Sequence, residues 1–211
     1  MYRRVLTMQD ISCVGQCSTT VALPILSACG LEACILPTAL LSTHTGGFGK
    51  PAVVHFDGAL TDIWHHWQEN GITFDAILVG YLGSLAAVKA AEEIIDRLLA
   101  PGGVAIVDPA MADNGKLYSG FDEDYVRAIG SLAGKADIIL PNVTEAAIFA
   151  ASSRFFPCIS APVKTAAKIS PVPWQPVPIR LWRYSCCTVP SCRTMPVLSS
   201  SKSTPVSTAH G

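Results

Sequence analysis

The stretch ADIILPNVTE (residues 136–145) predicts a buried strand that leads directly into a capped helix. Its three apolar residues, 138–140, suit a short strand buried on both faces of a parallel sheet. Pro141 has no amide proton and therefore ends the hydrogen bonding of that strand. Asn142 then stands where a helix N-cap belongs, and Glu145 follows at the capping-box distance. Taken alone, the decamer is explained by a capped helix with no further role.

The preceding residues alternate between strand and helix patterns. Apolar strand segments are expected at 4–8, 33–36, 74–79, 104–107 and 138–140. Helices are expected at 18–29, 60–70, 85–100 and 121–132, and after Asn142. Connections of helical length between consecutive strands indicate an α/β fold with a mostly parallel sheet and helices on both faces, a three-layer α/β/α arrangement.

Polar residues follow these strands and should gather at one edge of the sheet, where open α/β sheets bind ligands. The residues expected there are Asp10, the loop 44–49, Tyr81, Asp108, and Asn142 with Glu145. The glycine-rich segment 42–50 suits close backbone approach to a ligand, although such loops are more often flexible connections. It lacks the Walker phosphate-loop pattern. Asp108 could bind Mg²⁺ through oxygen or water, or it could simply cap a turn.

Composition divides the chain near residue 150. Residues 1–150 contain 8 Lys and Arg against 16 Asp and Glu, whereas residues 151–211 contain 7 basic residues and no acidic one. The second part also has nine prolines, eleven serines and a single glycine. We therefore expect a folded domain over 1–150 and an irregular, basic, Pro- and Ser-rich tail without a native fold over 151–211.

Charge and hydropathy give no sign of a nucleic-acid or membrane partner. The net charge is -1, and the apolar run at the N-terminus ends at Gln9 and Asp10, too early for a signal peptide. The uncharged segment 11–31 contains Pro24 and several polar residues, which disfavour a membrane span. A cytoplasmic protein is expected.

Five motifs together resemble the pyridoxal and pyridoxine kinases of the ribokinase-like superfamily. They are MQDIS at 8–12 with Gly15, LSTHTG at 41–46, GYLGS at 80–84, Asp108-Pro109, and PNVTE at 141–145. The resemblance rests on their order and spacing along the first 150 residues, because no single motif would suffice. It implies a ribokinase-like fold that is truncated here.

The resemblance also implies an activity and a set of site residues. This family transfers the γ-phosphoryl group of ATP to the 5′-hydroxymethyl group of pyridoxal, pyridoxine or pyridoxamine, in pyridoxal 5′-phosphate salvage. The implied vitamin-binding residues are Asp10, Ser12, His44, Thr45, Gly46 and Tyr81. The implied ATP-binding residues are Asp108, Asn142 and Glu145, of which Asp108 and Glu145 would also face Mg²⁺. Many relatives have serine at position 10, so the aspartate there should alter a contact with the vitamin. Such proteins often form homodimers, but no interface is evident from these residues.

The second half of the family pattern is missing. A G-x-G-D segment should supply an anion hole and the aspartate that accepts the substrate's proton, yet residues 146–211 contain no such segment and no acidic residue after position 145. No catalytic base can therefore be assigned. The simultaneous loss of acids, glycines and periodicity suggests a shift of reading frame between Ile148 and Ser153. A genuine proline-rich tail that binds SH3-like grooves is the weaker alternative.

Three functions remain open from the sequence. The first is a pyridoxal kinase with impaired catalysis, and the second is a kinase for the hydroxymethylpyrimidine of thiamine synthesis. The third is a vitamin-binding remnant without catalysis. In each case the strand at 138–140 would be left as an apolar sheet edge, which favours aggregation.

Overall fold

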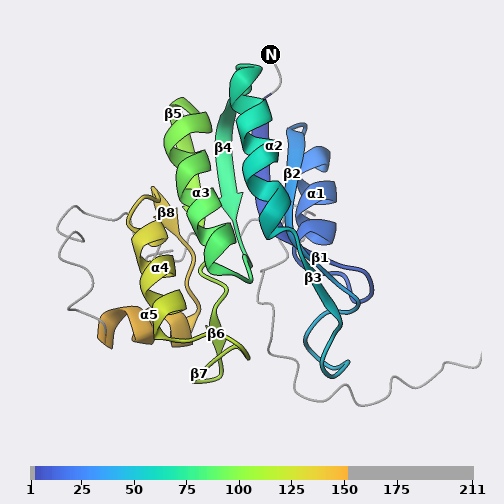
Figure 1. Ribbon diagram of the computed structural model, residues 1–211, viewed down its shortest axis with the longest axis vertical. Helices are drawn as coiled ribbons and strands as arrows, with labels where there is room; N and C mark the ends of the chain where they lie inside the picture. Colours follow the sequence, from blue (N-terminus) through green and yellow to red (C-terminus); the bar gives the residue numbers. More distant parts are fainter. Residues whose placement is uncertain (1–2, 152–211) are drawn as a thin grey trace, which may run out of the picture. The chain divides into compact units, whose positions relative to one another are not determined.

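The computed structural model describes residues 3–151, so the expectations for the tail and for the reading frame lie outside the described residues. A six-stranded sheet in the order β3-β2-β1-β4-β5-β8 forms the centre of this part (Figure 1). All neighbouring strands are parallel except β3, which pairs antiparallel with β2. The strands span Arg4–Ser12 (β1), Glu32–Leu41 (β2), Val53–His55 (β3), Phe74–Val79 (β4), Leu99–Val107 (β5) and Ile138–Ile139 (β8).

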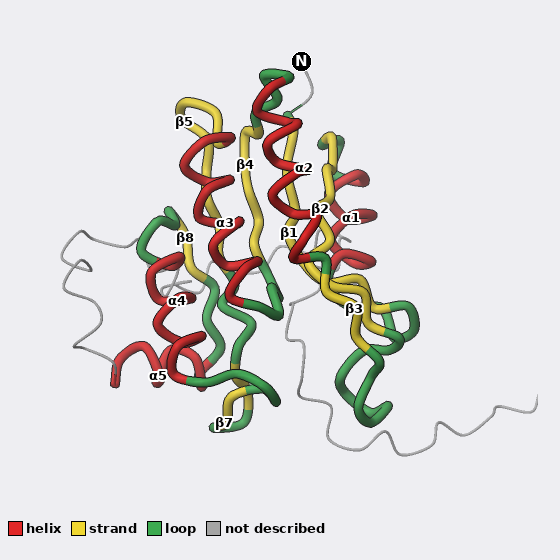
Figure 2. Tube along the Cα trace, viewed as in Figure 1, coloured by secondary structure: helices red, strands yellow, loops and turns green. Residues whose placement is uncertain are grey.

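Helices connect the strands and cover both faces of the sheet. Helices α2, α3 and α4 lie side by side on one face, and α1 packs against β1 and β2 on the other (Figures 1 and 2). Their bounds are Thr19–Ala28 (α1), Asp57–Glu69 (α2), Leu85–Leu98 (α3) and Glu123–Ala133 (α4), with α5 at Val143–Ala151. The predicted three-layer α/β/α arrangement with a mostly parallel sheet is therefore confirmed over the described residues.

The main core lies between the central strands and helix α3. Leu6, Met8 and Ile77 point into it from β1 and β4 and are fully buried, as are Ala91 and Ile94 of α3. Helix α3 has its apolar residues spaced along one face, and its first turn is capped because the Ser84 hydroxyl accepts a bond from the Ala87 amide. Burial of these side chains removes apolar surface from water and accounts for the position of this helix.

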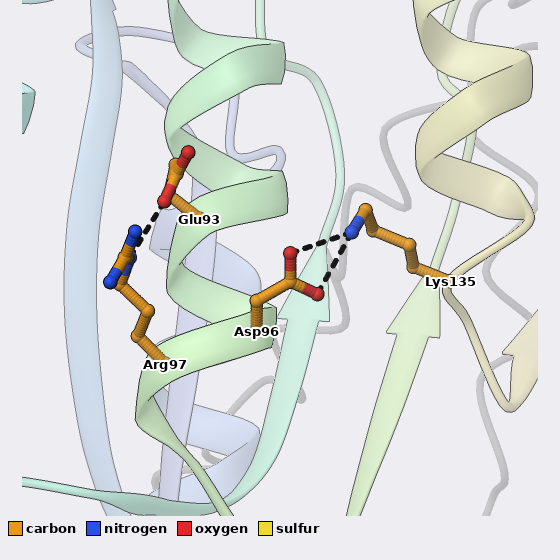
Figure 3. A network of polar contacts seen from close by, with 4 residues as sticks. All are labelled: Glu93, Asp96, Arg97 and Lys135. Carbon is orange, nitrogen blue, oxygen red and sulfur yellow. Dashed lines mark hydrogen bonds and ion pairs between the residues drawn. The ribbon is translucent and has the colours of Figure 1, made fainter.

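One ion pair joins helix α3 to the end of α4 on the surface, and a second lies within α3 (Figure 3). Lys135, just beyond α4, donates to both carboxylate oxygens of Asp96 at 2.8 and 2.6 Å. On the same helix Arg97 donates to Glu93, one turn earlier, at 2.7 Å. These groups are partly exposed, so each pair should contribute at most about 1 kcal/mol.

Several predicted boundaries were wrong. The first strand continues to Ser12 rather than ending near residue 8, and a register shift between Gln9 and Ile11 accommodates its polar end. Strand β5 begins at Leu99 rather than at residue 104, so residues 101–103 belong to the strand. Three short strands were missed: β3 and the hairpin of β6 (Ala112–Asp113) and β7 (Lys116–Leu117). Two- and three-residue strands are too short to show a hydrophobic period.

The edge of the sheet at β8 agrees with the predicted apolar edge. Within residues 3–151, β8 pairs only with β5, through Ile138 and Ile139. Leu140 and Val143 beyond it are 47% and 89% exposed. Among the helices that the structure describes, none has the length and apolar character needed to cross a membrane.

Candidate active site

The ends of four parallel strands are joined by backbone hydrogen bonds along one edge of the sheet. The Gly80 amide donates to the Met8 carbonyl at 2.9 Å, and the Asp108 amide donates to the Val79 carbonyl at 2.8 Å. The series continues with the Leu140 amide, which donates to the Val107 carbonyl at 2.9 Å. These bonds hold the segments after β1, β4, β5 and β8 next to one another. Strand β1 lies between β2 on one side and β4 on the other, so the chain builds the sheet outward from β1 in both directions. The carboxyl end of β1 is therefore the topological switch point, where open α/β sheets bind ligands.

Asp10 and Ser12 form a buried polar pair at the end of β1. They are 4% and 3% exposed, and the Ser12 hydroxyl donates to Asp10 Oδ2 at 3.1 Å. Burial and then the charge of the Asp10 carboxylate raise the pKa of the Tyr81 phenol, which follows β4 at the same edge. The Thr38 hydroxyl of β2 donates to the Tyr81 carbonyl at 2.9 Å and fixes this segment from the other side.

The glycine-rich loop 42–50 folds against the residues that follow β1. The His44 amide donates to the Val14 carbonyl at 2.8 Å, and the His44 ring accepts a bond from the Gly46 amide at 3.1 Å. Gly15 has φ +79, and a Cβ there would lie 3.0 Å from the Cβ of His44, so this contact requires glycine. The structure therefore brings His44 next to Val14 and Gly15, just after β1, with Gly46 bonded to the His44 ring, whereas Thr45 is exposed on the loop.

Glu145 is the most extensively bonded carboxylate at this edge, and it is 1% exposed. Its Oε1 accepts bonds from the amides of Met111 and Ala112 at 2.9 and 3.3 Å, and its Oε2 accepts from the Asn142 amide at 2.9 Å. Asn142 Oδ1 accepts from the Glu145 amide at 3.0 Å, which completes a reciprocal capping box at the start of α5. The capped helix inferred from the decamer is present, and its carboxylate also fixes the segment after β5.

A second set of contacts holds the β6–β7 hairpin to the start of α5. The Asn142 side-chain amide donates to the Ala112 carbonyl at 2.7 Å, and the Gly115 amide donates to the Thr144 hydroxyl at 3.0 Å. Sequence reasoning missed this role of Thr144. The only available signal was a hydroxyl between the two capping residues, which does not reveal a partner 29 positions away.

At the end of β5, Asp108 accepts fewer hydrogen bonds than Glu145 does. It is partly buried, and its Oδ1 accepts one bond from the Ala110 amide at 3.2 Å, across a turn in which Ala110 has φ 37. Burial and then the nearby Glu145 carboxylate raise the pKa of Asp108 to about 6. Two neighbouring negative groups in a partly dehydrated place form an electrostatic environment that a cation would relieve.

These two carboxylates fit Mg²⁺, although within residues 3–151 no group of three or more His, Cys, Asp or Glu side chains could hold a metal ion. Mg²⁺ commonly takes only one or two carboxylates, with waters and phosphate oxygens completing its octahedron. Asp108 retains a free oxygen for this purpose. Glu145 has both oxygens engaged by amides, so it would act on the ion mainly through its charge.

Sequence reasoning also missed an aromatic cluster beside Tyr81. The rings of Tyr81 and Phe121 lie 5.8 Å apart, and Phe121 stacks on Tyr125 at 3.8 Å. The cluster connects the segment after β4 to the start of α4. Phe121 and Tyr125 are four residues apart, a helical spacing that signals mutual contact but not the contact with Tyr81.

No protein-family model matches the chain. Among curated proteins, the pyridoxine/pyridoxal/pyridoxamine kinase of Bordetella avium is 36% identical over 118 residues, covering 52% of this chain and 38% of that protein. The pyridoxal kinase of Arabidopsis thaliana is 28% identical over 147 residues, covering 68% of this chain and 47% of that protein. The chain thus spans less than half the length of these curated relatives.

Solved structures give the same relationship. The pyridoxal kinase of Lactobacillus plantarum superposes with a TM-score of 0.66 at 42% identity, over 71% of this chain and 53% of that one. A Bacteroides thetaiotaomicron protein, described as a phosphomethylpyrimidine kinase and crystallised with pyridoxal, gives 0.68 at 34% identity, over 72% and 52%. The pyridoxal kinase of Leishmania donovani, in complex with ADP and pyridoxamine, gives 0.63 at 26% identity, over 71% and 53%.

Proposed function

We propose that this chain, whose N-terminal part resembles pyridoxal kinases in sequence and fold, binds a B6 vitamer and ATP at the carboxyl edge of its sheet. The reaction of this site is transfer of the γ-phosphoryl group of ATP to the 5′-hydroxymethyl group of pyridoxal, pyridoxine or pyridoxamine. The observation that carries the proposal is the backbone-bonded series from β1 to β8, which holds Asp10, Tyr81 and Asp108 along one edge.

The two ends of this edge would bind different ligands. Asp10, Ser12 and Tyr81, with His44 and Gly46 on the adjoining loop, would contact the vitamin ring. Thr45 belongs to the same motif and is expected to reach the ligand from its exposed position. Asp108, Asn142 and Glu145 would lie at the nucleotide end, the last two by fixing the loop after β5. This arrangement suits phosphoryl transfer, in which catalysis is mostly positioning and charge neutralisation.

Asp108, supported by the charge of Glu145, would hold Mg²⁺ at the nucleotide end. When bound, the ion would neutralise charge on the phosphate oxygens. The raised pKa of Asp108 favours this assignment, because a carboxylate that is costly to ionise alone gains most from a neighbouring cation.

Phosphate transfer should be slow in this chain. The sequence contains no G-x-G-D segment and no acidic residue after Glu145, so the proton of the substrate hydroxyl has no assigned acceptor. General acid–base catalysis contributes about 10²–10⁴-fold to such reactions. We therefore expect binding of both ligands with a rate reduced by roughly that factor.

A second candidate is a kinase for hydroxymethylpyrimidine, favoured by the 34% identity to the Bacteroides protein described as a phosphomethylpyrimidine kinase. The two substrates share a hydroxymethyl group on a nitrogen heterocycle, so the same strand ends could position either. A third candidate is a vitamin-binding protein without transferase activity.

One experiment separates these candidates. The purified chain is incubated with MgATP and each B6 vitamer or hydroxymethylpyrimidine, the phosphorylated product is quantified, and binding is measured in parallel by calorimetry. Slow formation of a B6 phosphate supports the proposal, and turnover on the pyrimidine alone supports the second candidate. Vitamer binding without any turnover supports the third, whereas no binding of vitamer or nucleotide would refute the proposed site.

Three further expectations accompany this function. Residues 1–150 would form the kinase part, with 151–211 as a separate tail. The protein would act in the cytoplasm. Any homodimer would have to form without covering the edge that carries Asp10 and Asp108.

A further inference from the structure

Asp10 is a buried carboxylate with very few partners. Its residue is 4% exposed, and its one side-chain hydrogen bond in the described part of the chain comes from the Ser12 hydroxyl. Within residues 3–151 no lysine, arginine or histidine lies at ion-pair distance from it. A buried carboxylate normally has a cation or several N–H donors beside it, because removing the charge from water is costly.

The contrast with Glu145 shows that this is a property of Asp10 and not of the edge in general. Glu145 is equally buried but accepts three bonds from backbone amides, so its charge is compensated by the fold. Asp10 receives a neutral hydroxyl only. The phenol of Tyr81, whose pKa is raised by burial and then by the Asp10 charge, has no cationic form near neutral pH and so supplies no positive charge to Asp10.

We propose that Asp10 is the counter-ion for a positively charged amine on the ligand, so that the site selects the amine-bearing vitamer pyridoxamine over the alcohol pyridoxine. This inference rests on the proposed function, because it assumes that the ligand occupies the strand ends near Ser12 and Tyr81. The two vitamers differ only in an ammonium or a hydroxyl group on the same carbon. An ammonium would donate a charge-assisted hydrogen bond to Asp10, roughly twice as strong as a neutral one.

The test compares the two vitamers on the full chain by titration calorimetry at pH 7. The wild type should bind pyridoxamine about tenfold or more tightly than pyridoxine. Asp10→Asn keeps the side-chain shape but removes the charge, and Asp10→Ser replaces the carboxylate with a neutral hydroxyl; both should abolish the preference. Asp62→Asn, an exposed aspartate on α2, is the matched control and should retain it.

The possible results separate this inference from the proposed function. Equal affinity of the wild type for both vitamers, or an unchanged preference in Asp10→Asn, would overturn the role of Asp10 while leaving the vitamin site intact. Failure of the wild type to bind either vitamer would overturn both proposals.

Stability without ligand gives an independent readout. If the role of Asp10 is to pair with a cationic ligand, the ligand-free Asp10→Asn variant should unfold at the same or a higher urea concentration than the wild type, because the substitution removes an uncompensated buried charge. A clearly lower midpoint would identify Asp10 as a structural residue and contradict the proposal.

Discussion

Replacing Glu145 should destabilise the fold far more than replacing an ordinary helix carboxylate. In Glu145→Ala the amides of Met111 and Ala112 lose their buried acceptor, at about 1.5 kcal/mol each, and α5 loses a capping bond of about 1 kcal/mol. The expected loss in the free energy of unfolding is therefore about 4 kcal/mol. Glu145→Gln keeps one acceptor oxygen but turns an NH₂ group toward a donor, so about 2 kcal/mol is expected.

The assay is urea unfolding followed by far-UV circular dichroism at pH 5. Asp108 has a pKa of about 6, so at pH 5 it is mostly protonated, and relief of its repulsion with Glu145 contributes little to the difference. Glu123→Gln and Glu123→Ala are matched controls, because Glu123 also lies in the first turn of a helix and its side chain is 95% exposed. Each control should change stability by less than about 0.5 kcal/mol.

The reasoning would be refuted if the Glu145 variants lost no more stability than the Glu123 controls. That result would mean that the amides near residue 111 find other acceptors, and that the carboxylate does not fix the loop after β5. A large loss in Glu145→Ala with none in Glu145→Gln would instead show that the side-chain shape matters and its charge does not.

Three other predictions concern separate parts of the fold. Asp108→Asn should stabilise the chain at pH 7.5 by up to about 3 kcal/mol, from a pKa raised from 3.8 to about 6, and by much less at pH 4. Because the folded state binds the Asp108 proton more tightly than the unfolded state does, the wild type loses stability as the pH rises from 4 to 7.5, and the Asn variant does not. An equal stability difference between wild type and variant at the two pH values would contradict this prediction. Ser84→Ala should lower the free energy of unfolding by about 1–2 kcal/mol, since it removes both the cap of α3 and the 2.6 Å bond to Asp57. A double-mutant cycle with Asp57→Ala would measure the coupling energy between Ser84 and Asp57. Leu140→Lys should reduce aggregation measured by light scattering, because it places a charge on the exposed edge at β8, and unchanged scattering would argue against edge pairing.

The strands and the capped helix could be predicted because their signals are local. The strand expected at 74–79 matches β4 residue for residue, and α3 begins at Leu85 as expected, directly after its cap Ser84. The capping box at Asn142 and Glu145 depends only on a spacing of three residues, and it is present. These features require no knowledge of distant parts of the chain.

Features that depend on distant partners could not be predicted in the same way. Glu145 is more than thirty residues away in sequence from Met111 and Ala112, whose amides it binds, and no local pattern around Glu145 predicts these bonds. The extension of β1 through Asp10 was hidden by its polar residues, which a strand pattern excludes unless pairing with β2 is already known. The antiparallel β3 is exposed along its length and therefore carries no alternation of apolar and polar residues.

The reading-frame hypothesis has its own direct check. Translation of the underlying nucleotides in the other two frames from codon 146 should reveal a G-x-G-D segment in one of them. Its absence from both frames would remove the hypothesis and favour a genuine tail.

The central claim is that a B6 vitamer binds at the carboxyl edge of this sheet, and amide chemical shifts of the ¹⁵N-labelled chain test it most directly. Titration with pyridoxamine should move the signals of Asp10, Ser12, Gly46 and Tyr81, while those of exposed α2 residues such as Asp62 stay in place. Shifts scattered over the helices, or no shift at the strand ends at saturating vitamer, would contradict it.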